Sequence, residues 1–341
     1  METVLDSEHP DLAVLNGDLL TCEFVPTDDV NSTIDKIVEP LKNRSIPWAT
    51  AYGNHDMSKT CSTRDMAIHE QTIGGKLAFT QSMVSGEYES LGTSNYFIPV
   101  YSSSGGGNPD IAMLLWFFDS KGGHAFERTD SNGKDVPVAD WVDESVVNWF
   151  NLEKAAINSA NGRVIPSLAF VHIPVHATWA FQHGPGVDSE REPGLNDDPA
   201  GHQSMSCDAA GKDCHWNGKD TPFMNALANT EGLMAVFSGH DHGDDWCMKW
   251  SDLPNNDPQN GNGIHLCFGR HTGYGGYGEW TRGARQIVVH EGSLKEGREV
   301  ETWIRLEDGQ ISGRVILNAT YGVDKYTPAT ETNGKPVLPP I

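Results

Sequence analysis

Four apolar segments of this chain are each followed by residues that can bind a metal ion. The segments and the residues that follow them are 12–15 with Asp18, 47–52 with Asn54 and His55, 167–171 with His172, and 233–237 with His240 and His242. Apolar runs of this length predict buried β-strands. In an open α/β layer, ligands bind beyond the carboxyl ends of the strands, so we expect these side chains to converge there.

Each segment taken alone has an ordinary explanation. A strand followed by Gly-Asp is common, residues 53–56 could form a simple turn, and a lone His172 is more often a hydrogen-bonded core residue than a ligand. The sequence Gly239-His-Asp-His242 is more specific, because residues i and i+2 after a strand point to the same side. The occurrence of all four in order argues against coincidence. Carboxylate, amide and imidazole ligands suit Mn, Fe or Zn.

The remaining pattern predicts one layered α/β domain. Residues 30–41 place Ile34, Ile37, Val38 and Leu41 on one helical face, and residues 139–160 form the longest expected helix. Residues 96–101 and 111–118 are expected to form a hairpin, and the chain becomes strand-rich after residue 264. Residues 176–221 have the composition of a long loop, which in a compact domain is typically functional or disordered.

The order Gly-Asp, Gly-Asn-His-Asp, a strand-borne His, and Gly-His-Asp-His resembles the calcineurin-like metallophosphoesterase superfamily. The resemblance runs from about residue 5 to residue 320. Residues 169–174 (Ala-Phe-Val-His-Ile-Pro) and the glycine-rich segment 269–278 are similar to the Dcr2-type branch, a fungal group related to purple acid phosphatases. The resemblance implies a four-layer α/β/β/α sandwich over residues 1–320. Residues 321–341 are polar and contain prolines, so we expect a polar C-terminal arm there.

The resemblance also implies a role for individual residues. Asp18 would bridge two divalent metal ions, with Asn54, His172 and His240 completing one site and His242 binding the other. A metal-bridging hydroxide would attack phosphorus, and His55 would act as the general acid that protonates the leaving oxygen. In the glycine-rich segment, the residues expected to line the substrate pocket are Arg270, His271 and Tyr274. The alternative for Arg270 is an ion pair with a surface carboxylate.

Two positions depart from the family pattern. The superfamily opens with an Asp-x-His motif on its first strand, and no such motif precedes Asp18. Residues 1–11 instead resemble the helix that follows this motif, so we expect the chain to start at an internal methionine and to lack the first strand and its two ligands. In addition, Thr21 stands where purple acid phosphatases carry a tyrosine, so no iron–tyrosinate chromophore is expected.

Composition restricts the partners and the compartment. The net charge of −23 opposes binding to nucleic acid, and no apolar run approaches the length of a membrane span. Six cysteines and the glycosylation sequons at Asn31, Asn43 and Asn318 favour a secreted or endomembrane glycoprotein. The amino terminus has no signal peptide, which favours the cytoplasm unless the true start lies upstream.

The positions of the cysteines suggest three pairs. Cys247 follows the Gly-His-Asp-His turn and Cys267 lies before the glycine-rich segment, so a bond between them would brace the site. The other two expected pairs are Cys207 with Cys214 and Cys22 with Cys61. The alternative is six reduced thiols in a cytosolic enzyme.

Two functions from different classes remain open at this point. The first is a metal-dependent phosphomonoesterase or phosphodiesterase acting on a small phosphate ester or a phosphoprotein. The second is a catalytically impaired, metal-binding pseudophosphatase with an interaction or structural role, which the absent Asp-x-His motif favours. A nuclease is disfavoured by the negative charge.

Overall fold

The computed structural model describes residues 1–103, 110–207, 213–251, 253, 260–296 and 298–329. A six-stranded mixed sheet lies at its centre, in the order β11-β12-β10-β7-β4-β3. Its strands are β3 Tyr96–Tyr101, β4 Ile111–Phe118, β7 Ser167–Val171, β10 Leu233–Ser238, β11 Cys247–Trp250 and β12 Ile264–Phe268. The four inner strands are parallel, whereas β3 and β11 pair antiparallel at the two edges. The carboxyl ends of the parallel strands therefore share one edge of the sheet.

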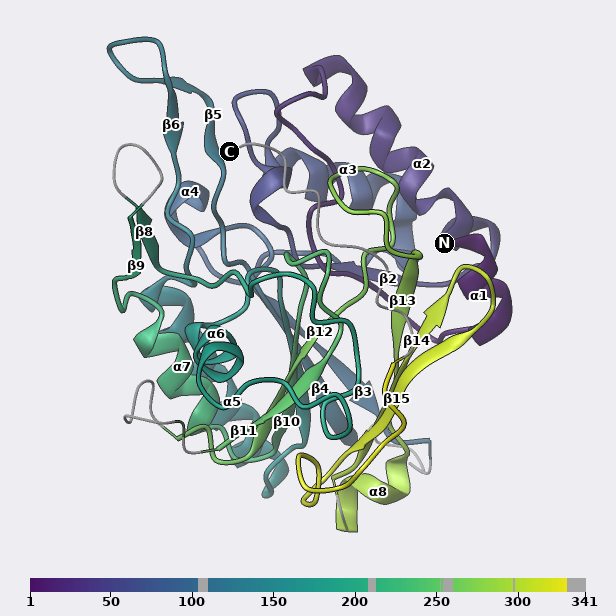
Figure 1. The fold of residues 1–341 in the computed structure, drawn as a ribbon. Coiled ribbons are helices and arrows are strands. Elements are labelled where there is room, and N and C mark those ends of the chain that lie inside the picture. Colours follow the sequence, from purple (N-terminus) through teal and green to yellow (C-terminus); the bar gives the residue numbers. More distant parts are fainter. Residues whose placement is uncertain (104–109, 208–212, 252, 254–259, 297, 330–341) are drawn as a thin grey trace.

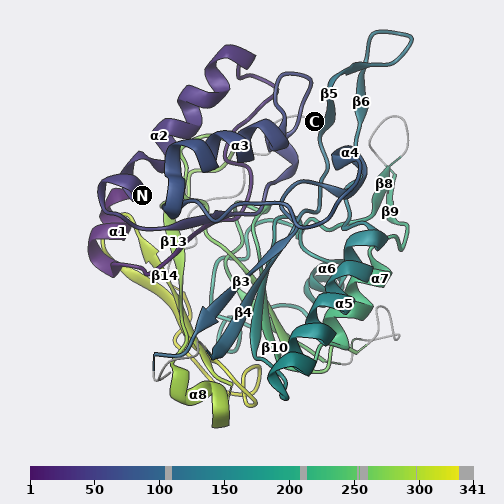
Figure 2. The ribbon, with the colours of Figure 1, turned by 180° about the vertical axis from the view of Figure 1, so that it is seen from behind.

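Helices cover one face of this sheet. They are α5 Glu144–Asn161, α6 His176–His183 and α7 Thr221–Ala228 (Figures 1 and 2). The side chain of Asp143 caps the first turn of α5, and Gly162 ends the helix with a φ of 64°. Phe150 of α5 packs edge-on against Trp116 of β4, with ring centroids 4.8 Å apart. This apolar packing holds the helices against one face of the central sheet.

The other face of the central sheet packs against further strands. These are β13 Gly283–Val288, β14 Val300–Leu306 and β15 Ile311–Leu317, which are antiparallel, and the parallel pair β1 Ala13–Leu15 and β2 Trp48–Thr50. Phe117, Phe170 and Phe237 of the central sheet share one buried cluster with Val315 and Leu317 of β15. The two β layers therefore form a common core.

Three helices form the outermost layer beyond β1 and β2. They are α1 Glu2–Glu8, α2 Val30–Asn43 and α3 Thr63–Gly74. Leu5, Val38 and Trp48 meet in one buried cluster, which fastens α1 and α2 to β2. Glu70 of α3 is buried and accepts hydrogen bonds from four side chains of this region, those of Trp48, Thr50, Tyr52 and Thr80. The expected α/β/β/α sandwich is confirmed.

Short elements complete the described part of the chain. The remaining helices are α4 Tyr88–Leu91, α8 Glu291–Glu296 and the 3₁₀ turns Thr27–Asp29, Asn54–Asp56 and Gly75–Leu77. Two hairpins, β5 His124–Thr129 with β6 Asp135–Pro137 and β8 Met205–Cys207 with β9 Cys214–Trp216, lie on the same side of the molecule (Figures 1 and 2). The six cysteines pair as expected, Cys22 with Cys61, Cys207 with Cys214, and Cys247 with Cys267.

Three segments differ from what the sequence pattern predicted. Helix α5 begins at Glu144 rather than at residue 139, because Asp143 caps it. The stretch 176–221 contains α6 and the β8–β9 hairpin. Residues 321–326 lie against the domain, since Tyr321 is buried and donates a hydrogen bond to the carbonyl of Cys247. Residues 104–109, between the two strands of the expected hairpin, and residues 330–341 of the expected arm lie outside the described residues.

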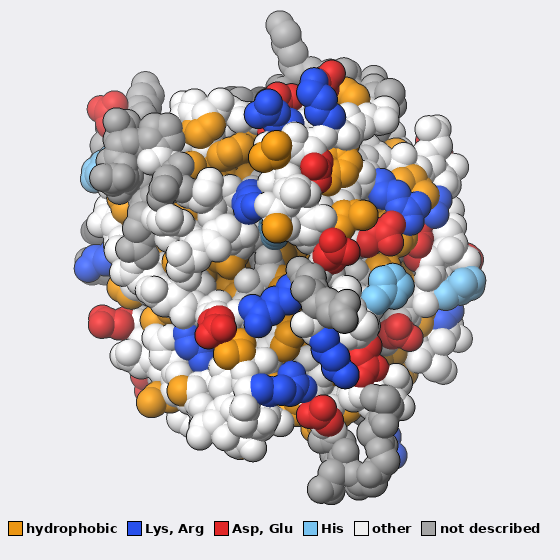
Figure 3. Space-filling model, turned by 90° about the horizontal axis from the view of Figure 1, so that it is seen from below, with side chains coloured by type: hydrophobic (Ala, Val, Ile, Leu, Met, Phe, Trp, Pro, Cys, Tyr) orange, Lys and Arg blue, Asp and Glu red, His pale blue; other side chains and the backbone are white. Residues whose placement is uncertain are grey.

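The surface at the starting ends of the parallel strands carries both signs of charge. Figure 3 shows this face with lysine and arginine side chains grouped near its middle and acidic side chains around them. Hydrophobic side chains are interspersed there rather than gathered in one patch. Within the described ranges, no helix has both the length and the apolar character needed to cross a bilayer.

Candidate metal centre

The predicted ligands lie in turns that follow the strands of the two β layers. Asp18 follows β1 and His240 follows β10, with φ angles of 51° and 72°. Both residues therefore adopt the left-handed region, which costs on the order of 1–3 kcal/mol for a residue other than glycine. Such strain concentrates at functional sites, because the surrounding structure must hold the backbone in place.

Asp18, His172 and His240 form a compact cluster. Each offers one ligand atom, and these atoms all lie within 4.8 Å of one another. Nδ1 of His172 donates to the carbonyl of Asn16 at 2.8 Å, so in the neutral ring Nε2 carries the lone pair. This Nε2 is buried and lies 2.9 Å from Oδ2 of Asp18, which is an ion-pair distance for a protonated ring. Burial opposes a charge on the ring, but the Asp18 carboxylate outweighs it and raises the pKa of His172. A divalent cation bound to both atoms would take the place of that proton, since metal ligands bind in their deprotonated form.

Asn54 adds an amide oxygen to this cluster. Its Oδ1 lies 3.0 Å from Nδ1 of His240. Glycines allow the ligands to approach so closely: a Cβ on Gly17 would lie 2.2 Å from Nδ1 of His172. A Cβ on Gly53 would lie 2.3 Å from Oδ1 of Asp18. The nitrogen and oxygen donors present therefore fit a divalent ion of the Mn, Fe or Zn type.

The turn that carries Asn54 and His55 is fixed by a buried carboxylate. Asp56 accepts hydrogen bonds from the backbone N–H groups of Gly53 at 2.8 Å and Leu20 at 3.0 Å. Burial and the nearby Asp18 raise the pKa of Asp56 to about 7. The same carboxylate thus connects the loop after β1 to the loop after β2.

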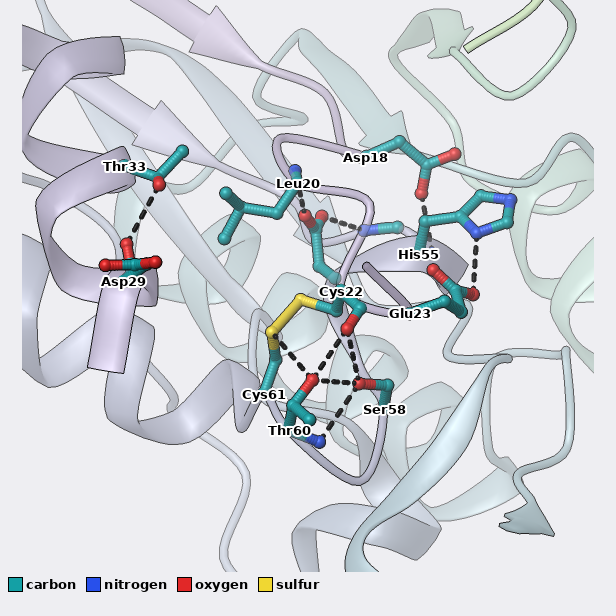
Figure 4. The surroundings of a disulfide bond; sticks show 12 residues. Asp18, Leu20, Cys22, Glu23, Asp29, Thr33, His55, Ser58, Thr60 and Cys61 are labelled. Atoms are coloured by element: carbon teal, nitrogen blue, oxygen red, sulfur yellow. Dashed lines mark hydrogen bonds and ion pairs between the residues drawn. A yellow bond between two sulfur atoms is a disulfide. The ribbon is translucent and has the colours of Figure 1, made fainter. Parts of the chain in front are cut away.

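His55 lies beside the cluster and is held by Glu23. Oε1 of Glu23 lies 2.8 Å from Nδ1 of His55, and the backbone N–H of His55 donates to Oδ1 of Asp18 (Figure 4). The hydrogen bond to Glu23 raises the pKa of His55 to about 9, so the imidazole carries a proton at neutral pH. The Cys22–Cys61 disulfide fastens the loop of Glu23 to the segment that follows His55.

His242 lies outside the compact cluster. Its Nδ1 is 3.1 Å from the carbonyl of Tyr277, and its ring stacks on Tyr277 with centroids 4.1 Å apart. The ring of His271 lies 3.9 Å away on centroids, and burial lowers the pKa of His271 to about 3. The glycine-rich segment therefore does contact a predicted ligand, through His271 and Tyr277.

Arg270 and Tyr274 make different contacts from those expected of pocket residues. The guanidinium of Arg270 is fully buried, with Nη1 at 2.6 Å from Oδ2 of Asp245, and it also donates to the carbonyl of Thr281. The side chain of Tyr274 is 81% exposed and donates to Glu307. A buried ion pair with Asp245 accounts for the position of Arg270 without a substrate.

Comparison with known proteins identifies the family. A family model described as calcineurin-like phosphoesterase matches residues 1–244. The chain belongs to this family. Within it, the chain is 25% identical over 325 residues to "Probable inactive purple acid phosphatase 14" of Arabidopsis thaliana, covering 90% of this chain and 71% of that protein. It is 27% identical to "Phosphatase DCR2" of Saccharomyces cerevisiae over 90% of this chain and 47% of the yeast protein, so it spans about half of that relative.

A solved structure shares the fold. The crystal structure of a dimetal phosphatase from Danio rerio superimposes with a TM-score of 0.51 at 12% identity, covering 94% of this chain and 87% of the fish protein. At this identity the likeness concerns the fold alone. Together with the family match, it confirms the architecture that the resemblance implied.

Sequence reasoning missed three residues that position the candidate ligands and the candidate general acid of this calcineurin-like phosphoesterase. Asn16 and Tyr277 contribute backbone carbonyls to His172 and His242, and a backbone acceptor leaves no signal in residue type. Glu23 contributes a carboxylate to His55. Glu23 could have been found from the sequence: it lies five positions after Asp18 in the loop that follows β1, and this loop packs beside the turn that carries His55.

Proposed function

We propose that the chain is a metal-dependent phosphoric ester hydrolase that acts on phosphomonoesters or phosphodiesters. The observation that supports this most strongly is the cluster of Asp18, His172 and His240, in which a buried imidazole nitrogen and a carboxylate oxygen lie 2.9 Å apart. Asn54 and His55 lie directly beside it. Family membership supports hydrolysis of a phosphate ester.

In this proposal the chain supplies ligands for two divalent ions. Asp18, Asn54, His172 and His240 would hold one, and Asp18 with His242 would contribute to the other. When bound, such ions neutralise phosphate charge and make water a better nucleophile at neutral pH. Asn16 holds the His172 ring in the tautomer whose Nε2 points at the site. Second-sphere contacts of this kind orient ligands and strengthen their basicity.

His55 is the proposed general acid. Its raised pKa keeps a proton on the ring, and the hydrogen bond to Glu23 fixes the orientation of that ring. The ester oxygen leaves with the electron pair of the broken P–O bond and takes up this proton. A positioned histidine of this kind contributes about 10²- to 10⁴-fold to rate.

A pair of substrates tests the role of His55. We expect His55→Ala to lower kcat/KM for phenyl phosphate about 100-fold or more, but to affect p-nitrophenyl phosphate much less. The reason is that p-nitrophenolate leaves readily without a proton, whereas phenolate does not. Steady-state kinetics with Mn²⁺ on both esters, and on bis-p-nitrophenyl phosphate, measures the difference. Glu23→Gln should show the same pattern in weaker form, and equal losses on both monoesters would contradict the general-acid role.

A second candidate function is a catalytically impaired metal-binding protein. Two observations favour it. His242 lies outside the compact cluster and contacts Tyr277, and relatives at 25% identity carry the name "Probable inactive purple acid phosphatase". This candidate predicts metal binding without metal-dependent turnover of any of the three esters.

We also propose a secretory location. Three disulfides and two exposed sequon residues, Asn31 and Asn43, support it. The net charge of −23 keeps nucleic acid out of the proposed set of partners.

A further inference from the structure

A cavity of about 440 Å³ opens beside the metal cluster. Asn54 and His240, both proposed metal ligands, form part of its wall. The rest comes from the base of the β5–β6 hairpin, from residues 139–141, and from the β8–β9 hairpin with the turn before it. The cavity is therefore continuous with the place where a phosphate would bind. Whatever is esterified to that phosphate has this space available.

The part of the cavity wall nearest Asn54 is formed by two glycines, Gly122 and Gly123. A Cβ on Gly122 would lie 2.7 Å from the Cβ of Asn54, and a Cβ on Gly123 would lie 2.2 Å from the Asn54 carbonyl oxygen. Gly123 also has a φ of 69°, a conformation that side chains disfavour. The β5–β6 hairpin is thus seated directly on the turn that carries Asn54. This close packing fixes the shape of the cavity next to Asn54 and His240.

Polar groups in the cavity mostly accept hydrogen bonds. Asp140 contributes a carboxylate. Nδ1 of His202 donates to the carbonyl of Gln203 at 2.8 Å, which leaves Nε2 of that ring as an acceptor. The amide of Asn217 donates to the hydroxyl oxygen of Ser206 at 3.0 Å, so the proton of this hydroxyl can be donated to a ligand. Hydrogen-bond acceptors of this kind are suited to a ligand that carries hydroxyl groups.

The lining of the cavity also includes apolar side chains. Trp141 presents an aromatic ring, and Ile173 and Met205 add apolar contacts. Among the described residues that line the cavity, none is lysine or arginine. Lys121 lies 5.6 Å from the Trp141 ring centroid, but its ammonium is nearly buried and donates to the carbonyl of Ser90. An anionic group would therefore find a carboxylate here and no lining basic side chain.

We propose that this cavity is the leaving-group subsite and that it takes an uncharged, polyhydroxylated alcohol such as a sugar. The inference rests on the proposed phosphoesterase function and narrows its substrate class to the phosphate ester of a neutral polyol. A sugar ring would pack on Trp141 while its hydroxyls donate to Asp140 and His202. In the hydrolysis, water oxygen bonds to phosphorus and the P–O ester bond breaks. The released sugar oxygen takes a proton and the alcohol departs through the cavity.

Kinetics on three esters test the subsite. The wild type should hydrolyse glucose 6-phosphate with a higher kcat/KM than 3-phosphoglycerate, whose leaving group carries a carboxylate. Asp140→Asn should lower kcat/KM for glucose 6-phosphate about 10-fold or more, since a hydrogen bond to a charged acceptor is lost. For p-nitrophenyl phosphate, the same variant should lose several-fold less than for the sugar ester, because this leaving group donates no hydroxyl to Asp140.

Asp213→Asn provides the matched control. It removes the same charge from an exposed position next to β9 that does not line the cavity, and it should leave all three rates unchanged. Asn217→Arg should act in the opposite direction and raise kcat/KM for 3-phosphoglycerate, because it brings a cation to the rim. Hydrolysis of p-nitrophenyl phosphate with no preference for the sugar ester, or with no effect of Asp140→Asn on it, would overturn the inference.

A binding measurement separates this inference from the proposed function. Saturation-transfer NMR with free glucose and metal-free protein should show contact in the wild type and in Asp213→Asn. The signal should be lost in Trp141→Leu, whose folding is checked by its thermal unfolding transition. A protein that binds glucose but hydrolyses none of the esters would refute the proposed function alone. Absence of glucose binding by the wild type would refute the subsite.

Discussion

Asp18→Asn is expected to lower kcat for p-nitrophenyl phosphate by about 100- to 1,000-fold, the range seen when one preorganised electrostatic contact is removed from a reaction centre. Asp18 lies at the middle of the cluster, with His172 at 2.9 Å and the backbone of His55 at 2.8 Å. Asparagine tolerates the left-handed φ of 51° that this position requires, so the fold should persist. Steady-state kinetics and elemental analysis of bound metal, run on the same preparation, measure the effect.

Asp11→Asn is the matched control for this variant. Asp11 is exposed just before β1, and its replacement removes the same charge without touching the cluster. It should keep the metal content and the rate of the wild type. Wild-type activity and metal content in Asp18→Asn would mean that the cluster is not the metal centre.

Asp245→Ala is expected to lower the free energy of unfolding by about 3–5 kcal/mol, because it leaves a fully buried guanidinium without its carboxylate. Oδ2 of Asp245 lies 2.6 Å from Arg270, and Oδ1 accepts the backbone N–H of Leu195 at 2.6 Å. Both side chains of the pair are fully buried. Urea denaturation monitored by tryptophan fluorescence measures the loss.

The double variant Asp245→Leu with Arg270→Met is the control for this prediction. It removes both charges together and should lose less stability than Asp245→Ala, since the Arg270 guanidinium is removed along with its carboxylate. If Arg270 instead bound the substrate phosphate, Arg270→Met alone would raise KM and leave the unfolding midpoint unchanged. That result would restore the role expected from the sequence.

Most of the scaffold could be predicted because its signals are local. The apolar run Ser167–Val171 forms β7 over those same residues, since a fully buried parallel strand needs continuous apolar side chains. Helix α6 was missed inside the stretch 176–221, although His176–His183 contains no helix-breaking residue. Its surroundings are rich in Gly and Pro, and only packing against the central sheet selects the helical form.

The site was predictable where residue type and strand position coincide. Asp18, His172 and His240 follow apolar strands, and the sheet brings these turns together. Contacts between residues far apart in the sequence could not be predicted from residue type and strand position. Arg270 finds Asp245 25 positions earlier, and nothing in the sequence distinguishes this buried carboxylate from an exposed one. The walls of the cavity come from two separate hairpins, whose placement depends on tertiary packing.

The most direct test of the central claim is a metal titration of the chelator-treated chain. Mn²⁺ binding followed by calorimetry, with hydrolysis of p-nitrophenyl phosphate measured on the same samples, compares the wild type with His240→Ala. We expect turnover by the wild type to rise in step with metal binding, and His240→Ala to lose most of both. Metal binding without turnover would contradict the hydrolase and favour the impaired, metal-binding protein. Equal binding by wild type and His240→Ala would contradict the metal centre itself.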